Sequence, residues 1–337
     1  HAPWECHLLS GLIGNRFALF FKVHPVLSDA TTIVQLLVNT LAEQTESLPR
    51  APWSQAVTGW RRGADGVNFS GVAGRARVRP LAAAFGRLLR AGGSDSPDLR
   101  APYTAPHLAL QVRTGPQRRV ATQQYERVRL ASVARSFGAT EGELVLYLCA
   151  TALRRFFREH NALPLDESLV AMLPGQLDAS GIGLVNLGTQ YADPHQRLKA
   201  IRASLRASRE HLQALPQDLL PTYTFLATSA FLVGQVTRLG SGPFPMFNLV
   251  ISSTYGPESP RWLGESRLNA LYPLFPLLRN NALTFDCMRF DDKLHVAVVG
   301  ARDEVPRLQR LAVYMGQALA DLEELLDTRR QQAGAFQ

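Results

Sequence analysis

The chain has 337 residues, of which 46% are hydrophobic and 19% are charged. This length favours two domains or one large domain, and the composition excludes a wholly disordered chain. The net charge of +8 comes almost entirely from arginine, because the only lysines are Lys22, Lys199 and Lys293. A basic surface attracts phosphate-bearing partners such as CoA, anionic lipids or nucleic acid. The sequence contains no known nucleic-acid-binding module, so nucleic acid is the least favoured of these partners.

The three cysteines lie far apart and form no CxxC pair, so they predict no zinc site and fit a reducing compartment. The most apolar run, Leu219 to Val236, is interrupted by proline, threonine, serine and glutamine. This run predicts a buried helix, or a helix that binds a lipid surface, rather than a membrane span. No signal peptide is visible, and we expect a cytoplasmic protein.

Two strands are predicted at the start of the chain. Trp4 to Leu12 alternates between apolar and polar residues, and Gly14-Asn15 forms a turn into the next run, Arg16 to Val23. That second run is apolar on both sides, so we expect a well-buried strand.

A short polar break separates this strand from a predicted helix that begins near Thr31 and ends near Ser47. Asp29 stands where a helix N-cap is expected, because its carboxylate can accept from free backbone N–H groups. His24 lies between strand and helix, where a rigid strand can aim an imidazole that stays accessible. Two interpretations of His24 stand at this point: a hydrogen-bonded structural residue or a catalyst.

The rest of the chain predicts a long crossover followed by a larger α/β part. Gly and Pro interrupt residues 49–105, with one amphipathic piece at Leu81 to Leu89. Beyond it we expect a basic turn at Arg118-Arg119, helices and strands in alternation, and an arginine-rich helix that carries a solvent-facing His195 and His211. The expected helices are 123–137, 140–160, one capped by Asp193, and 305–326; the expected strands are 168–174, 183–191, 247–253, 282–290 and 294–299.

The residues from Arg16 onwards resemble the active-site segment of the bacterial wax ester synthase/diacylglycerol acyltransferase family, within the CoA-dependent acyltransferase superfamily. Members of this family carry His-His-x-x-x-Asp-Gly after a similar Arg-Phe-Ala-Leu-x-Phe-Lys-Val. Here the seven positions begin with His24-Pro25 and end with Asp29-Ala30. The string GATEGELVLYLCATALRRFF strengthens the resemblance, which covers nearly the whole chain.

The resemblance implies an α/β fold with two chloramphenicol-acetyltransferase-like halves, each a mixed sheet covered by helices. The chain begins at His1 with little sequence ahead of the motif, so we expect a fragment whose first half is incomplete. The expected ranges are 1–48 for the remainder of the N-terminal half, 49–105 for the crossover linker and 106–337 for the C-terminal half.

The same resemblance implies an O-acyltransferase that moves a fatty acyl group from acyl-CoA to a long-chain alcohol or diacylglycerol. Acyl-CoA is a substrate, and neither a cofactor nor a metal is expected. His24 and Asp29 are the expected catalytic residues. The family's second His, the expected general base, is replaced by Pro25, which has no titratable group.

The alternative function is a catalytically impaired pseudoenzyme that binds acyl-CoA or lipid, or that partners an active homologue. Other polar positions of the family are also altered, with Thr284 in place of an Asn and Ala301 in place of an Asp. Because the surface is basic, we expect peripheral contact with an anionic inner membrane or a lipid droplet.

Overall fold

A computed structural model describes residues 3–24, 27, 30–45, 51, 54, 75–91, 98–108, 110–175, 181–237 and 245–334. The chain forms two compact units, each described by itself below. Unit 1 comprises residues 1–68 and 256–269, and unit 2 comprises residues 69–255 and 270–337. These units do not test whether residues 1–48, 49–105 and 106–337 are the functional divisions, so that division stays a prediction.

Unit 1 contains the predicted hairpin. Strands β1 (Trp4–Leu12) and β2 (Arg16–Val23) pair antiparallel, with an irregularity between Leu9 and Leu12. The turn needs left-handed backbone, which Gly14 and Asn15 adopt with φ of 79° and 53°. The unit also contains helix α1 (Ala30–Thr40) and the short strands β7 (Trp262–Leu263) and β8 (Ser266–Arg267).

The segment around β7 is tied to the end of α1 within unit 1. Ala42 and Trp262 exchange two backbone hydrogen bonds, both of 2.8 Å. Beside them Arg261 and Glu43 form an ion pair with an N–O distance of 2.6 Å. Residues more than 200 positions apart are therefore joined in one compact unit.

The prediction that β2 is well buried was wrong. Phe20 and Phe21 are 40% and 38% exposed, and Phe17 and Leu19 are exposed to a similar extent. The physical reason is that β1 and β2 form a sheet of two strands, with no third strand pairing with them in the described part of unit 1. The apolar side chains of a two-stranded sheet stay exposed unless other elements pack on its faces.

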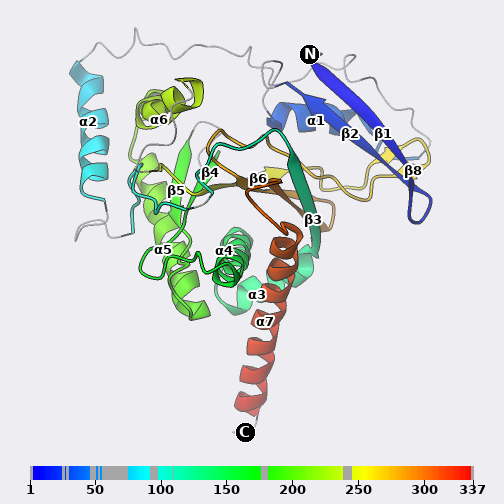
Figure 1. The fold of residues 1–337 in the computed structure, drawn as a ribbon. Helices are drawn as coiled ribbons and strands as arrows, with labels where there is room; N and C mark the ends of the chain where they lie inside the picture. The colour runs from blue at the N-terminus through cyan, green and yellow to red at the C-terminus, as the bar shows by residue number, and fades with distance from the viewer. Residues whose placement is uncertain are drawn as a thin grey trace. The chain divides into compact units, whose positions relative to one another are not determined.

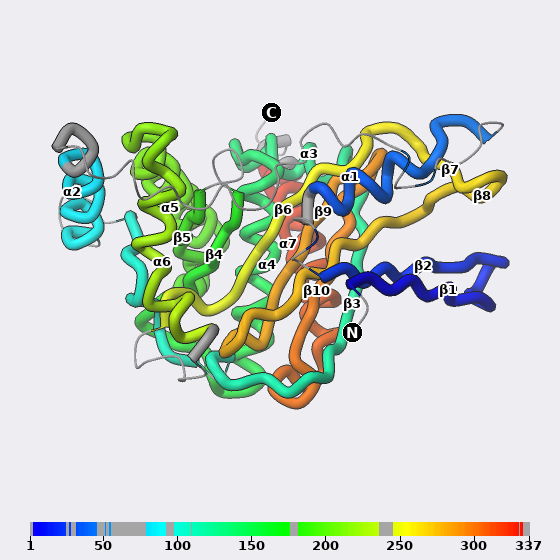
Figure 2. The backbone as a smooth tube through the Cα atoms, turned by 90° about the horizontal axis from the view of Figure 1, so that it is seen from above, coloured from blue at the N-terminus to red at the C-terminus, as the bar shows by residue number. Residues whose placement is uncertain are grey.

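Unit 2 is built on a six-stranded mixed sheet in the order β3-β10-β9-β6-β4-β5, which Figure 2 shows side by side. Strand β6 runs parallel to β4 and β9, while the remaining pairs are antiparallel. The strands are β3 (Arg118–Glu126), β4 (Val170–Pro174), β5 (Ile182–Asn186), β6 (Leu249–Tyr255), β9 (Leu283–Phe290) and β10 (Lys293–Ala301).

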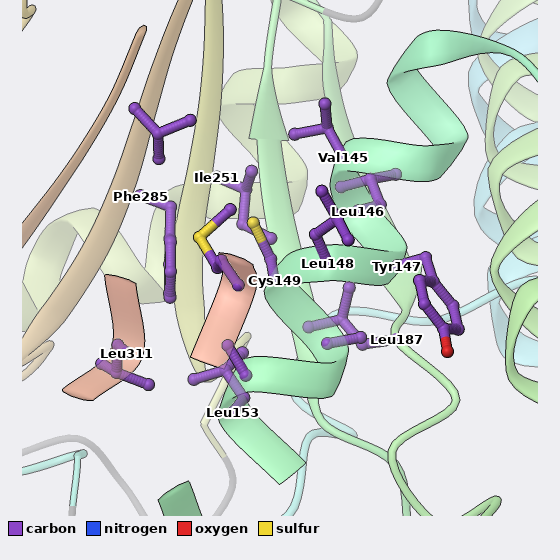
Figure 3. Close-up of a cluster of buried hydrophobic side chains, with 14 of the residues drawn as sticks. Val145, Leu146, Tyr147, Leu148, Cys149, Leu153, Leu187, Ile251, Phe285 and Leu311 are labelled. Carbon is purple, nitrogen blue, oxygen red and sulfur yellow. The ribbon is translucent and has the colours of Figure 1, made fainter. Parts of the chain in front are cut away.

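One face of this sheet is covered by helices (Figure 1). The helices of unit 2 are α2 (Arg75–Leu89), α3 (Arg127–Ser136), α4 (Glu141–Glu159), α5 (Pro194–Gln213), α6 (Leu220–Thr237) and α7 (Gln309–Gly334), with a 3₁₀ turn at Gln217–Leu219. Figure 3 shows Leu148, Cys149 and Leu153 of α4 directed towards the strand residues Ile251 and Phe285. All five side chains belong to one buried apolar cluster, which forms the core of the unit.

Helix α4 confirms its prediction, including the cap. Thr140 Oγ1 accepts from the Glu143 backbone N–H at 3.2 Å, and the Glu143 carboxylate accepts from the Thr140 N–H at 2.8 Å. The predicted hairpin near the end of the chain is confirmed as β9–β10, and Asp193 caps α5 with Pro194 in its first turn.

The predicted helix 123–137 was wrong in its first four residues. Residues up to Glu126 form strand β3, and helix α3 begins only at Arg127. Pairing with β10 along the whole strand, from Lys293–Glu126 to Ala301–Arg118, overrides the local preference.

Within the described ranges, none of the helices combines the length and the apolar character that a membrane crossing requires. Helix α6, which contains most of the apolar run, buries Leu220 and Tyr223 and exposes Leu226 and Val233.

Candidate functional site

His24 lies where the sequence predicted it, between the last residue of β2 and the start of α1. Its backbone N–H donates to the carbonyl of Pro3 at 2.9 Å, and its carbonyl accepts from the Leu27 N–H at 2.9 Å. The first bond ties His24 to the segment that leads into β1, and the second forms the turn that leads towards α1. The residue is exposed, so the chain presents an accessible imidazole at a strand-to-helix junction.

Asp29 and Pro25, the other two motif positions that decide the chemistry, lie outside the described residues. Helix α1 begins at Ala30, directly after Asp29. An N-cap is the residue immediately before the first helical residue, so this start agrees with the position predicted for the Asp29 cap. The catalytic roles of His24 and Asp29 stay predictions.

A buried carboxylate in unit 2 was missed by the sequence analysis. Asp286 on β9 is fully buried, and its Oδ1 accepts from the hydroxyls of Ser252 (2.8 Å) and Thr284 (3.1 Å). Its Oδ2 accepts from the Phe275 backbone N–H at 3.1 Å. Burial raises the pKa of Asp286 to about 7, against the lowering effect of these three hydrogen bonds.

Asp286 lies on the sheet face opposite the main core, because its neighbours Phe285 and Cys287 point into that core and side chains alternate along a strand. Since its carboxylate is enclosed and accepts from Phe275, it holds the segment before β9 against the sheet. A single carboxylate inside the apolar run 282–290 was the sequence signal that could have identified it.

His295 on β10 is the second buried titratable group that the sequence analysis missed. Its ring packs edge-on to Tyr272, with centroids 5.5 Å apart, and tilted against Phe290. Burial, then the charge of Lys293, lowers the pKa of His295 to about 4, so the ring is neutral near pH 7. Within the described residues, no three His, Cys, Asp or Glu side chains are grouped so that they could hold a metal ion.

The prediction for the two histidines of α5 was half right. His195 is exposed, as expected, but His211 is 6% exposed and therefore buried. The reason is that the C-terminal part of α5 packs against α2 and α6 in a second apolar cluster, which includes Leu212 and Tyr223. His211 Nε2 lies 2.6 Å from the Tyr223 hydroxyl.

The fold of the chain is similar to that of a solved acyltransferase structure. A wax ester synthase/diacylglycerol acyltransferase from Marinobacter aquaeolei VT8 superposes with a TM-score of 0.74 at 26% identity, covering 95% of this chain and 71% of that one. The match confirms the predicted α/β class, with a mixed sheet covered by helices, of the type built from two chloramphenicol-acetyltransferase-like halves.

Sequence comparison defines the family. Residues 1–144 match the wax ester synthase/diacylglycerol acyltransferase catalytic domain, and residues 179–323 match the WS/DGAT C-terminal domain. A protein of Mycobacterium tuberculosis named as a diacylglycerol O-acyltransferase is 35% identical over 96% of this chain and 74% of its own length. The O-acyltransferase WSD of Acinetobacter baylyi is 29% identical over the same shares. The chain therefore belongs to the wax ester synthase/diacylglycerol acyltransferase family.

Proposed function

We propose that this chain is an O-acyltransferase that transfers a fatty acyl group from acyl-CoA to a long-chain alcohol or to diacylglycerol. The observation that carries the proposal is family membership over nearly the whole chain, since the matched relatives are named for these two reactions. Acyl-CoA is a substrate in this proposal, and the chain's own side chains supply the proton transfer.

The proposed reaction is a nucleophilic acyl substitution. The alcohol oxygen attacks the thioester carbonyl carbon, its proton moves to a base, the C–S bond breaks, and the CoA thiolate takes up a proton. The products are an ester and free CoA. We assign the base to His24, because it is the imidazole that the motif retains at the strand-to-helix junction.

Asp29 has a positioning role in this proposal. As the N-cap of α1, it would fix the turn that starts at His24 and carries the Leu27–His24 hydrogen bond. A carboxylate at this helix start also faces the positive end of the helix dipole, which favours its charged form. It acts on the reaction through the placement of His24.

The second candidate function follows from one observation, the proline that follows His24. The family's second His is absent at Pro25, and a scaffold without a base can bind acyl-CoA without turning it over. Losing a general base costs about 10²–10⁴-fold in rate and leaves binding intact.

The test is CoA release from acyl-CoA and a long-chain alcohol, measured with a thiol reagent. We expect the parent chain to release CoA and His24→Ala to lower that rate by about 10²-fold or more. His7→Ala is the matched control, because His7 is an exposed His on the neighbouring strand. If the parent binds acyl-CoA without turnover and Pro25→His with Ala30→Gly raises CoA release, the pseudoenzyme is the correct function.

We further propose peripheral association with an anionic inner membrane or lipid droplet, supported by the net charge of +8. Vesicle flotation measures it: binding to anionic vesicles at low salt should weaken severalfold at high salt. Binding that does not change with ionic strength would contradict electrostatic adsorption.

A further inference from the structure

A small pocket lies in unit 2, and none of its lining residues belongs to the motif segment. It has a volume of about 30 Å³ and is lined by residues of α2, α5, α6, β5 and the segment 99–102. Leu88, Leu99, Leu184 and Leu212 supply apolar walls, while His211 and Arg100 supply polar ones. A pocket of this size accommodates one small polar group, with apolar surface around it.

The histidine of this pocket has one satisfied and one unsatisfied nitrogen. Burial raises the pKa of Tyr223, so its hydroxyl keeps its proton, and its oxygen lies 2.6 Å from His211 Nε2. We assign the hydroxyl as the donor of this bond, which places the ring proton of His211 on Nδ1. No hydrogen-bond partner contacts that nitrogen within the described residues, although the side chain is buried. A buried N–H donor is therefore left available in the pocket wall.

Two arginines add positive charge at the same place. Arg100 lines the pocket, and Arg87 lies on α2 close enough that its charge lowers the pKa of His211. The Nε atoms of both are buried without a hydrogen-bond partner, and no carboxylate of the described residues forms an ion pair with either. Buried cationic donors that have no counter-charge among the described residues favour an anion.

We propose that this pocket binds the anionic head of an alkyl oxyanion, either a carboxylate or a phosphate ester, while the alkyl chain stays outside the pocket. His211 Nδ1 and Arg100 donate to the oxygens, and the positive charge of Arg87 on α2 adds to the attraction. Tyr223 is a positioning residue, because it holds the imidazole in the donating tautomer. The inference does not depend on acyl transfer, since it uses only the geometry of unit 2.

Calorimetric titration of the whole chain tests the proposal with four probes. Octanoate and octyl phosphate carry the two candidate heads on the same chain, inorganic phosphate is the head alone, and octanol is the body alone. We expect one or both octyl anions to bind and octanol to bind at least tenfold more weakly. The tighter of the two anions identifies the head group.

The variants locate the site. Arg100→Gln should weaken binding of the octyl anion by roughly 10- to 100-fold, the usual effect of losing a charge-assisted hydrogen bond. Arg87→Gln removes only a nearby charge and should weaken binding less. Arg90→Gln is the matched control: Arg90 is exposed directly after the end of α2, and its Nε donates to the Gly86 carbonyl. It should bind as the parent does.

The histidine gives a second readout that does not rely on a stable variant. In a nitrogen-detected NMR spectrum, the anion should shift the His211 Nδ1–H signal and leave the exposed His195 on the same helix unchanged. The proposal is overturned if none of the anions binds, if octanol binds as tightly as octanoate, or if Arg90→Gln weakens binding as much as Arg100→Gln. Anion binding that leaves the His211 signal unshifted also overturns it.

Discussion

The molecule contains two antiparallel hairpins of similar composition and opposite environment. In unit 1, β1–β2 exposes Leu8, Phe20 and Phe21 to a large extent. In unit 2, β9–β10 buries nearly every side chain, and Phe285 and Val298 have no exposed surface. The difference comes from neighbours, because β9 and β10 pair with β6 and β3 and carry helices on one face. An apolar sequence pattern therefore predicts a strand, but the surrounding elements decide whether that strand is buried in the core.

The largest expected effect compares one phenylalanine from each hairpin. Phe285→Ala removes a fully buried ring and should lower the free energy of unfolding by about 3–5 kcal/mol. Phe20→Ala should cost less than about 1 kcal/mol, because that ring already contacts solvent. Denaturant unfolding followed by circular dichroism measures both. Equal losses would mean that β1–β2 is covered as completely as β9–β10.

Asp286 makes the buried hairpin sensitive to pH. Its folded pKa of about 7 lies above the ordinary value of 3.8, so the folded state binds the proton more tightly than the unfolded state. The contribution of Asp286 to the free energy of unfolding is therefore fully present below about pH 4. It declines as the pH rises to about 7, by up to about 4 kcal/mol. His211 and His295 act in the opposite direction, because burial lowers their pKa to about 4.

The difference in unfolding free energy between the parent and Asp286→Asn, taken at each pH, gives the contribution of the Asp286 carboxylate. We expect the variant to gain stability relative to the parent between pH 5 and pH 8, measured by urea unfolding at each pH. Asp292→Asn, at an exposed position in the β9–β10 turn, is the control and should follow the parent. A parent and an Asp286→Asn variant with parallel pH profiles would exclude a raised pKa.

These contrasts show what sequence can and cannot predict here. Elements defined by local signals were predicted well: the Thr140 cap of α4, the Asp193 cap of α5, and the β9–β10 hairpin. Features that depend on distant partners were not. Strand β3 required its pairing with β10, and the burial of His211 required packing of α5 against α2 and α6.

The candidate site follows the same division. The position of His24 at a strand-to-helix junction was predictable, because the strand and the helix are both indicated by local sequence patterns. The enclosure of Asp286 was not, because its donors come from Ser252 on another strand and from the segment at Phe275. Only the occurrence of a lone carboxylate within an apolar run signals such a group in advance.

Gly300 of β10 and Gly11 of β1 are each sensitive to substitution, but for different physical reasons. A Cβ on Gly300 of β10 would lie 2.6 Å from Leu308 Cδ1 and 3.3 Å from Val305 Cβ. Gly300→Ala should therefore cost about 1–3 kcal/mol by overpacking. A Cβ on Gly11 of β1 meets no atom within 4 Å, but the residue has φ of +79°, so Gly11→Ala should cost about 1 kcal/mol through the backbone alone.

Second substitutions distinguish these causes. Gly11→Asn should cost less than Gly11→Ala, because Asn tolerates the left-handed region. In a double-mutant cycle, Leu308→Val should couple favourably with Gly300→Ala, because Val lacks the Cδ1 atom that the new methyl group meets. Additive effects at Gly300 and Leu308 would contradict the steric explanation. Unfolding midpoints of the single and double variants provide the measurement.

The smallest expected effect compares helix caps in the two units. Thr140 caps α4 with a reciprocal pair of hydrogen bonds to Glu143, so Thr140→Ala should lower the free energy of unfolding by about 1 kcal/mol. If Asp29 caps α1 as we propose, Asp29→Ala should cost a similar amount, and Asp29→Asn should retain most of the stability, because both residues are good caps. Thermal unfolding of the three variants measures the stability, and CoA release measures the reaction. Because the proposed Asp29 role is positional, Asp29→Asn should preserve both properties and Asp29→Ala should lower both.

An Asp29→Asn variant that is stable but slow would mean that the carboxylate itself takes part in proton transfer, and His24 would then not act alone.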